Sequence, residues 1–168
     1  MSYRTIITVV ALAATVLVAP GPETAPATAS TATCTWGGTP AAPTGTFTIN
    51  PGISNLPAPE ALKFRATGEL SGGGRCTGTM TFVGQIDAGS TCVLASFEGS
   101  VRGLPGVTRF WGKGSLTVPE LLYDSAGNVV GSDQPEIMTP ENQPKTTDCY
   151  TASGFTGGTF AATVELFR

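Results

Sequence analysis

Histidine is absent from this 168-residue chain, and charged residues make up only 12% of it. Without histidine, the Ser-His-Asp and Cys-His catalytic arrangements cannot form. Basic residues are also few, with nine lysines and arginines against twelve acidic residues and a formal net charge of −3. They are spread thinly along the sequence, whereas a nucleic-acid-binding protein needs a clustered basic face. We therefore expect neither histidine-based catalysis nor nucleic-acid binding.

The sequence also lacks an apolar run long enough to span a membrane. Its longest such run, residues 6–18, has about 13 residues, whereas a spanning helix needs roughly 20. The run is followed by small residues that end at Ala29, a pattern typical of a secretory signal peptide. We predict a signal peptide over residues 1–29 and a single secreted β domain over residues 30–168, extracellular and without stable membrane insertion. A retained membrane anchor is the alternative.

Four cysteines lie in the predicted secreted part: Cys34, Cys76, Cys92 and Cys149. Thiols pair in the oxidising environment outside the cell, so we predict two disulfides. The sequence leaves all three connectivities open. If Cys34 pairs with Cys76 and Cys92 with Cys149, each bridge closes a loop of about 40 to 60 residues and stabilises the fold by about 3 to 4 kcal/mol. The chain has no histidine and no closely spaced cysteine pair, so we predict no metal site and no cofactor.

Apolar residues alternate with polar ones along the chain, which predicts extended strands and no helix. The clearest hairpin joins residues 77–86 to residues 92–102 across the turn residues 87–90. A third strand over residues 107–118 extends this hairpin into a meander. Each hairpin strand has one apolar face, formed by Met80, Phe82 and Ile86 in the first strand and by Val93, Ala95, Phe97 and Val101 in the second.

The remaining strands and the glycines inside them indicate the fold class. We expect further strands over residues 46–49, 62–67, 121–124, 128–130 and 159–167. Glycine weakens a strand unless a bend or bulge uses it, and small barrels need such bends to close. We therefore predict an all-β antiparallel β-barrel of about 7–9 strands, with a β-sandwich as the alternative. The glycines in question are Gly78, Gly84, Gly99, Gly112 and Gly114.

Residues 132–158 show no strand pattern and are rich in proline, glutamine, glutamate, asparagine and threonine. A loop of that length in a compact domain is usually functional or disordered. One hypothesis is that residues 135–140 form a rigid exposed peptide that binds a protease, because stiffness lowers the cost of binding. The plainer interpretation, which we favour, is a loop that crosses one end of the barrel, with Cys149 holding its far end.

Paired carboxylates remain as groups that could act in acid–base catalysis. Glu98 and Asp124 are weak candidates, and Asp87, Glu120 and Glu165 are the other carboxylates on or near predicted strands. The strand phase places Glu98 opposite the face of Phe97, which indicates an outward position. If the face that carries Phe97 points outward instead, Glu98 points into a pocket-like barrel interior. We therefore assign no catalytic residue.

The two tryptophans have different expected roles. Trp36 is close to Cys34 in the sequence, and we expect it to pack against a disulfide rather than to contact a ligand. Trp111 shares a strand face with Arg109 and Lys113, which indicates either a cation–π stripe on the surface or part of a binding site.

Several short stretches carry a resemblance to a known group of proteins. They are FEG at 97–99, GLPGV at 103–107, FWG at 110–112, LYDSAGNVVG at 122–131 and FTGG at 155–158. Over most of the predicted secreted part, the chain resembles uncharacterised small secreted proteins of actinobacteria. This resemblance implies export and an all-β fold, and it implies no particular activity or substrate.

We predict a secreted, non-enzymatic β domain that acts by binding, and three roles remain open. The partner is either a small apolar ligand in the mouth of a barrel or another protein that contacts residues 132–158. One alternative is a small barrel enzyme of isomerase, cyclase or lyase type that uses carboxylates in a central cavity; another is an envelope-associated structural protein. A cavity of roughly a few hundred Å³ with an inward Glu98 or Asp124 would favour the enzyme. The oligomeric state is not predicted.

Overall fold

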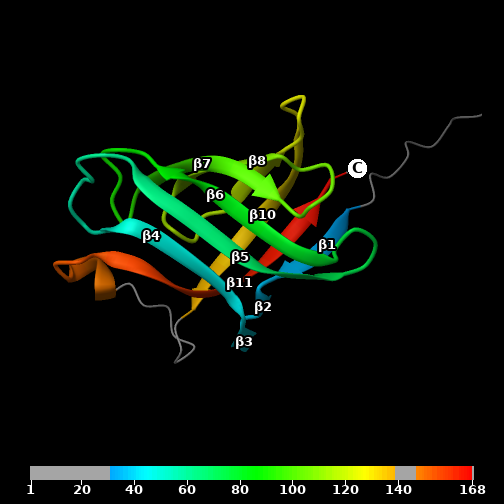
Figure 1. Ribbon diagram of the computed structural model, residues 1–168, viewed down its shortest axis with the longest axis horizontal. Coiled ribbons are helices and arrows are strands. Elements are labelled where there is room, and N and C mark those ends of the chain that lie inside the picture. Colours follow the sequence, from blue (N-terminus) through cyan, green and yellow to red (C-terminus); the bar gives the residue numbers. More distant parts are fainter. Residues whose placement is uncertain (1–30, 139–146, 168) are drawn as a thin grey trace, which may run out of the picture.

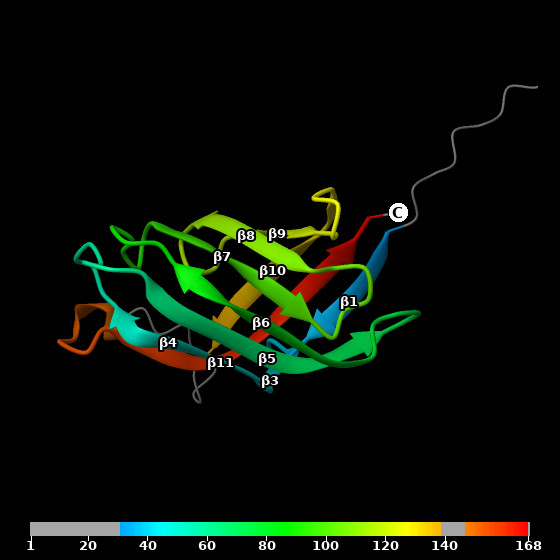
Figure 2. The same cartoon turned by 45° about the horizontal axis from the view of Figure 1, so that its top comes forward.

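The computed structural model describes residues 31–138 and 147–167. The predicted signal peptide over residues 1–29 lies outside the described residues, as do residues 139–146 of the predicted irregular segment. The described chain forms a closed antiparallel barrel of eight strands with two disulfides (Figure 1 and Figure 2). The predicted all-β barrel is therefore confirmed, in preference to the sandwich.

The barrel is an up-and-down meander in which each strand from β4 to β10 pairs with the next, and β11 pairs back with β4 to close it. The strands are β1 (Ala32–Trp36), β2 (Gly38–Thr39), β3 (Ala42–Pro43), β4 (Gly45–Ile53), β5 (Leu62–Gly72), β6 (Gly78–Ile86), β7 (Ala95–Arg102), β8 (Arg109–Gly114), β9 (Glu120–Tyr123), β10 (Val129–Met138) and β11 (Phe155–Leu166). A short 3₁₀ helix, η1 (Thr147–Tyr150), precedes β11.

Strand β1 extends the barrel wall beyond the end of β4. It pairs with the second halves of β5 and β11, whereas β4 pairs with the first halves of the same two strands. The strands β1 and β4 therefore lie end to end between β5 and β11. The small β2–β3 hairpin projects from the wall between them (Figure 1).

The alternation predicted for the central hairpin is confirmed, apart from one position. Met80, Phe82 and Ile86 of β6 and Ala95, Phe97 and Val101 of β7 are all buried. Val93 is instead 71% exposed, because β7 begins only at Ala95. The preceding residues form a tight turn in which Thr91 and Leu94 exchange backbone hydrogen bonds of 2.9 and 3.2 Å. This turn ends the alternation that the sequence suggests.

Residues 132–138 correct the prediction of a long irregular segment. They belong to β10, which pairs with β9 on one side and with β11 on the other. Pro135 is buried in this strand, opposite Ala162 of β11. The hypothesis of a rigid exposed peptide over residues 135–140 is therefore wrong for residues 135–138, which are part of the barrel wall. Residues 139 and 140 lie outside the described residues.

Aromatic rings fill much of the barrel interior. Phe82 stacks on Phe110 with ring centroids 4.4 Å apart, and Trp36 contacts Phe82 and Phe160 at 4.6 and 4.5 Å. The indole N–H of Trp36 donates to two backbone carbonyl oxygens, each 3.1 Å away. Trp36 was expected to pack against a disulfide, but its ring contacts are with interior aromatic side chains. The two hydrogen bonds satisfy the indole N–H, which is the only polar group of this buried side chain.

The two predicted disulfides are confirmed, and they lie at opposite ends of the barrel. Cys34–Cys76 joins β1 to the β5–β6 loop, and Cys92–Cys149 joins the β6–β7 loop to η1. Backbone hydrogen bonds of 2.9 and 3.1 Å also connect the β4–β5 loop to both cysteines of the second bridge. Three connections at that end of the barrel are thereby held together.

Candidate functional site

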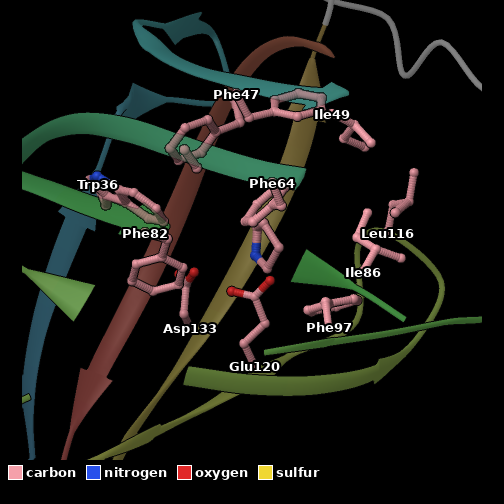
Figure 3. A pocket seen from close by; sticks show the side chains of 13 residues that line it. Trp36, Phe47, Ile49, Phe64, Phe82, Ile86, Phe97, Leu116, Glu120 and Asp133 are labelled. Atoms are coloured by element: carbon pink, nitrogen blue, oxygen red, sulfur yellow. The ribbon is translucent and has the colours of Figure 1, made fainter. Parts of the chain in front are cut away.

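A small cavity of about 40 Å³ lies inside the barrel (Figure 3). A buried water occupies about 10–15 Å³ of such a volume, so the cavity has room for about three waters or for the head group of a ligand. Its walls are apolar except for two carboxylates. The lining residues are Trp36, Phe47, Ile49, Phe64, Ala66, Phe82, Ile86, Phe97, Leu116, Glu120, Asp133, Pro135 and Phe160.

The cavity comes closest to solvent beside Phe64 and Leu116, which we call the entrance. These two side chains are half-buried, whereas the other lining residues are buried. Leu116 lies in the β8–β9 loop, and Figure 3 shows Ile49 and Ile86 on the same side of the cavity. The entrance therefore lies at the barrel end that carries the Cys92–Cys149 bridge.

Glu120 and Asp133 bring two carboxyl groups into this apolar interior. Glu120 is the first residue of β9, and Asp133 lies directly opposite it in β10. Both are buried, with 5% and 0% exposure, and both point into the cavity (Figure 3). Alternation along the strands explains their direction, because Leu122 on the face of Glu120 and Pro135 on the face of Asp133 are also buried.

Both carboxyl groups hold their protons more tightly than a carboxyl group in water. Burial raises the pKa of Glu120 well above its ordinary value, and the negative charge of Asp133 raises it further. Burial also raises the pKa of Asp133, to about 7. Glu120 is near enough to affect this titration, yet neither oxygen of Asp133 has a described partner in hydrogen-bond geometry. The pair therefore remains partly protonated near neutral pH, and the two carboxylate oxygens of Asp133 have no partner that meets hydrogen-bond geometry.

No basic side chain neutralises the pair from the cavity walls, as far as the structure describes them. The charged residues on the strands around the interior are exposed and therefore lie on the outer face of the barrel. They are Lys63, Arg65 and Glu69 of β5, Glu98 and Arg102 of β7, Arg109 and Lys113 of β8, Glu136 of β10 and Glu165 of β11. The charge of the interior thus depends on Glu120 and Asp133 alone among the described residues.

The structure places the two weak catalytic candidates away from the interior. Glu98 is exposed on β7, next to the buried Phe97. Asp124 lies in the β9–β10 turn, where its carboxylate accepts hydrogen bonds of 2.9 Å from the backbone N–H groups of Ala126 and Asn128 and from the Asn128 side chain. The Asn128 side chain is the largest cause that lowers the pKa of Asp124. Asp124 thus stabilises a turn.

The stripe predicted on β8 lies on the outer surface. Arg109, Trp111 and Lys113 are all exposed. The guanidinium carbon of Arg109 lies 6.0 Å from the ring centroid of Tyr123, so its aromatic neighbour is on β9 rather than on its own strand.

Of the two interior carboxylates, the sequence analysis named Glu120 and missed Asp133. The buried residues Gly131, Asp133 and Pro135 do occupy alternate positions. Glycine, aspartate and proline are all depleted in strands, however, so this stretch resembles a loop. The alternation is recognisable only once residues 129–138 are known to pair with a strand on each side.

Comparison of the chain with models of known protein families, with curated proteins and with solved structures gives no match. Within residues 31–138 and 147–167, no group of three or more His, Cys, Asp or Glu side chains is placed to hold a metal ion. The same residues include no helix that is long and apolar enough to cross a membrane. The chemistry that the site offers is that of its own groups, two carboxyls inside an aromatic cavity.

Proposed function

We propose that this protein is exported and binds a small, mainly apolar ligand inside its barrel without transforming it. The observation that carries this proposal is the apolar cavity with its entrance beside Phe64 and Leu116. Ligand sites are usually concave and mostly apolar, with a few polar groups that fix orientation, and barrel mouths are a common location. Glu120 and Asp133 are the few polar groups of this cavity.

The cavity volume limits what can enter. About 40 Å³ accommodates one end of a ligand, so the rest of the molecule would lie in the entrance. The side chains there include Ile49, Ile86 and Leu116 (Figure 3), which suit an alkyl or aryl body. Two disulfides support export, because such bridges persist in oxidising compartments.

Binding can be tested with two neutral probes, n-hexanol and benzyl alcohol, followed through the indole N–H resonances of the two tryptophans. Trp36 lines the cavity and Trp111 lies on the outer face. We expect a bound probe to shift the Trp36 resonance and to leave that of Trp111 in place. Leu116→Trp should weaken binding at least about tenfold by filling the entrance.

The matched control is Leu94→Trp, since Leu94 is 58% exposed and does not line the cavity. This variant should bind the probes like the wild type. Equal affinities of both tryptophan variants, or the absence of any shift at Trp36, would contradict the proposal.

A second candidate function is acid–base catalysis of an isomerisation, cyclisation or lyase step. The observation that favours it is the opposed pair of interior carboxyls, because a protonated acid beside a carboxylate can both donate and accept a proton. The two functions differ in the fate of the ligand. Recovery of an unchanged ligand supports binding, whereas a product formed by the wild type and not by Asp133→Asn supports catalysis.

A further inference from the structure

We propose that Glu120 and Asp133 together bind the primary ammonium group of a small amine, so that the ligand of this barrel is a protonated alkyl or arylalkyl amine. The inference rests on the proposed binding function and specifies its ligand class. It follows from three properties of the cavity: unsatisfied acceptors, the absence of a counter-charge, and aromatic walls.

The unsatisfied acceptors belong to Asp133. Its side chain is fully buried and faces the cavity, and neither of its carboxylate oxygens meets hydrogen-bond geometry with a described residue. The Glu120 carboxyl and the Gln134 backbone N–H lie close enough to lower the pKa of Asp133, but burial outweighs both. A buried acceptor without a donor costs free energy, and a ligand that supplies donors removes this cost. A primary ammonium carries three N–H donors, enough for both oxygens of Asp133 and for one oxygen of Glu120.

The charge of the cavity selects a cation. Glu120 and Asp133 face each other in adjacent strands, and none of the described lining residues is basic. The basic side chains of the neighbouring strands β5, β7 and β8 are exposed on the outer face. A bound ammonium would therefore be the main counter-charge of the pair, in an apolar environment where charges interact strongly. An anionic ligand would be repelled, and a neutral alcohol would leave the pair without a counter-charge.

The aromatic walls add a second attraction for a cation. Trp36, Phe47, Phe64, Phe82 and Phe160 line the same cavity as the two carboxyls, and ring faces attract ammonium groups within about 6 Å. Figure 3 shows the rings of Phe64 and Phe82 beside the carboxyl groups. The volume of about 40 Å³ fits a primary ammonium and its first carbon better than a bulky quaternary head.

Protons compete with the amine for the same carboxyls. Binding of an ammonium favours the ionised pair, so protons leave as the ligand enters. The charged groups on the strands packed against Glu120 and Asp133 are exposed on the outer face, so the pair itself dominates this coupling among the described residues. The affinity for an amine should therefore fall as the pH decreases from 8 to 5, by up to about tenfold per unit for each proton exchanged.

Three probes with the same tail test the ligand class at pH 8: n-hexylamine, n-hexanol and N,N,N-trimethylhexylammonium. We expect hexylamine to bind about 10- to 100-fold more tightly than hexanol, the range for hydrogen bonds that involve charged groups. The trimethyl compound keeps the charge but lacks N–H donors, so it should bind more weakly than hexylamine. Equal affinities of hexylamine and the trimethyl compound would overturn the primary ammonium as the recognised group.

Two variants locate the recognition, and a third serves as control. Asp133→Asn and Glu120→Gln should lose most of the preference for hexylamine while still binding hexanol. Glu98→Gln removes the same charge from the outer face of β7 and should keep the preference. A preference that survives in Asp133→Asn would overturn the proposal, and hexanol binding to that variant shows that it is folded.

The same measurements distinguish failure of the amine assignment from failure of the binding function. If the wild type binds hexanol and hexylamine equally well, the amine assignment fails and the binding function stands. If neither compound shifts the Trp36 resonance at any pH between 5 and 8, the binding function fails as well.

Discussion

At the scale of single residues, Glu120 and Asp133 determine how the stability of the empty barrel varies with pH. Burial raises the pKa of both groups above the values of the unfolded chain. As the pH rises from about 4, the unfolded chain loses protons that the folded protein retains. The free energy of unfolding therefore falls with rising pH until each group ionises in the folded protein, which for Asp133 occurs at its folded pKa of about 7.

The isosteric variant Asp133→Asn should remove much of this fall. We expect the variant to be more stable than the wild type at pH 8, by on the order of 2 kcal/mol, because it no longer ionises in an apolar cavity. At pH 4 the two proteins should differ little, since Asp133 is then protonated in the folded state. Urea denaturation at both pH values measures the difference.

Glu98→Gln is again the control, because Glu98 is exposed. It should leave the pH dependence of unfolding unchanged. A wild-type stability that rises between pH 5 and pH 8, or an Asp133→Asn variant that is less stable at pH 8, would contradict the expected burial of these acids.

At the scale of the strands, glycines permit approaches that no other residue allows. Gly84 of β6 lies opposite Gly99 of β7, and a Cβ atom on Gly84 would overlap the carbonyl oxygen of Glu98. A Cβ atom on Gly99 would come within 2.7 Å of the Phe110 ring, which stacks in the interior. These glycines therefore allow β6 and β7 to approach closely and the aromatic core to fill the space inside them.

Gly84→Ala should destabilise the barrel by about 1–3 kcal/mol or more, because the added methyl group meets rigid backbone. The control is Gly73→Ala in the β5–β6 loop, where a Cβ atom meets nothing within 4 Å. This control should leave stability unchanged or raise it slightly through the unfolded state. Thermal unfolding compares the variants, and equal transition temperatures of Gly84→Ala and the wild type would contradict the close approach.

Gly112 of β8 has a similar role next to the proposed site. A Cβ atom there would overlap the ring of Phe97 and lie 3.1 Å from the Cγ atom of Glu120. The glycine on β8 therefore leaves room for the carboxylate of β9 to turn inward. In this way the spacing of glycines within strands, which indicated a barrel, also shapes its interior.

At the scale of the whole molecule, the two disulfides act on opposite ends of the barrel. Their loops of 42 and 57 residues each correspond to about 4 kcal/mol in the chain-entropy model. Paired Cys→Ser substitutions at either bridge should lower the free energy of unfolding by about that amount. Because the bridges are far apart, the two losses should add in the quadruple variant.

The bridges should differ in their effect on ligand binding. Cys92–Cys149 holds loops at the entrance end, whereas Cys34–Cys76 lies at the other end. Removing the first should weaken hexanol binding, and removing the second should leave it unchanged in protein that remains folded. If removal of Cys34–Cys76 weakened hexanol binding more than removal of Cys92–Cys149, the assignment of the entrance to the Cys92–Cys149 end would be contradicted.

Much of the architecture could be predicted because it is a local property of the chain. The alternation of Met80, Phe82 and Ile86 repeats every two residues, and a half-buried strand requires that period. The candidate site was only half predictable. Glu120 stood beside a recognised strand, but Asp133 lay among glycine and proline residues, whose local preferences oppose strand formation.

The sequence by itself determined the extended character of the chain, the glycines within its strands and the presence of two disulfides, because each depends on neighbouring residues or on residue type. Only the tertiary structure decided which cysteines pair, that β10 continues through Pro135, and that Asp133 faces Glu120. These outcomes depend on contacts between distant segments. Closure of the barrel pairs β10 with a strand on each side, and this pairing outweighs the low strand preference of glycine, aspartate and proline. The pairing directs the side chain of Asp133 into the interior.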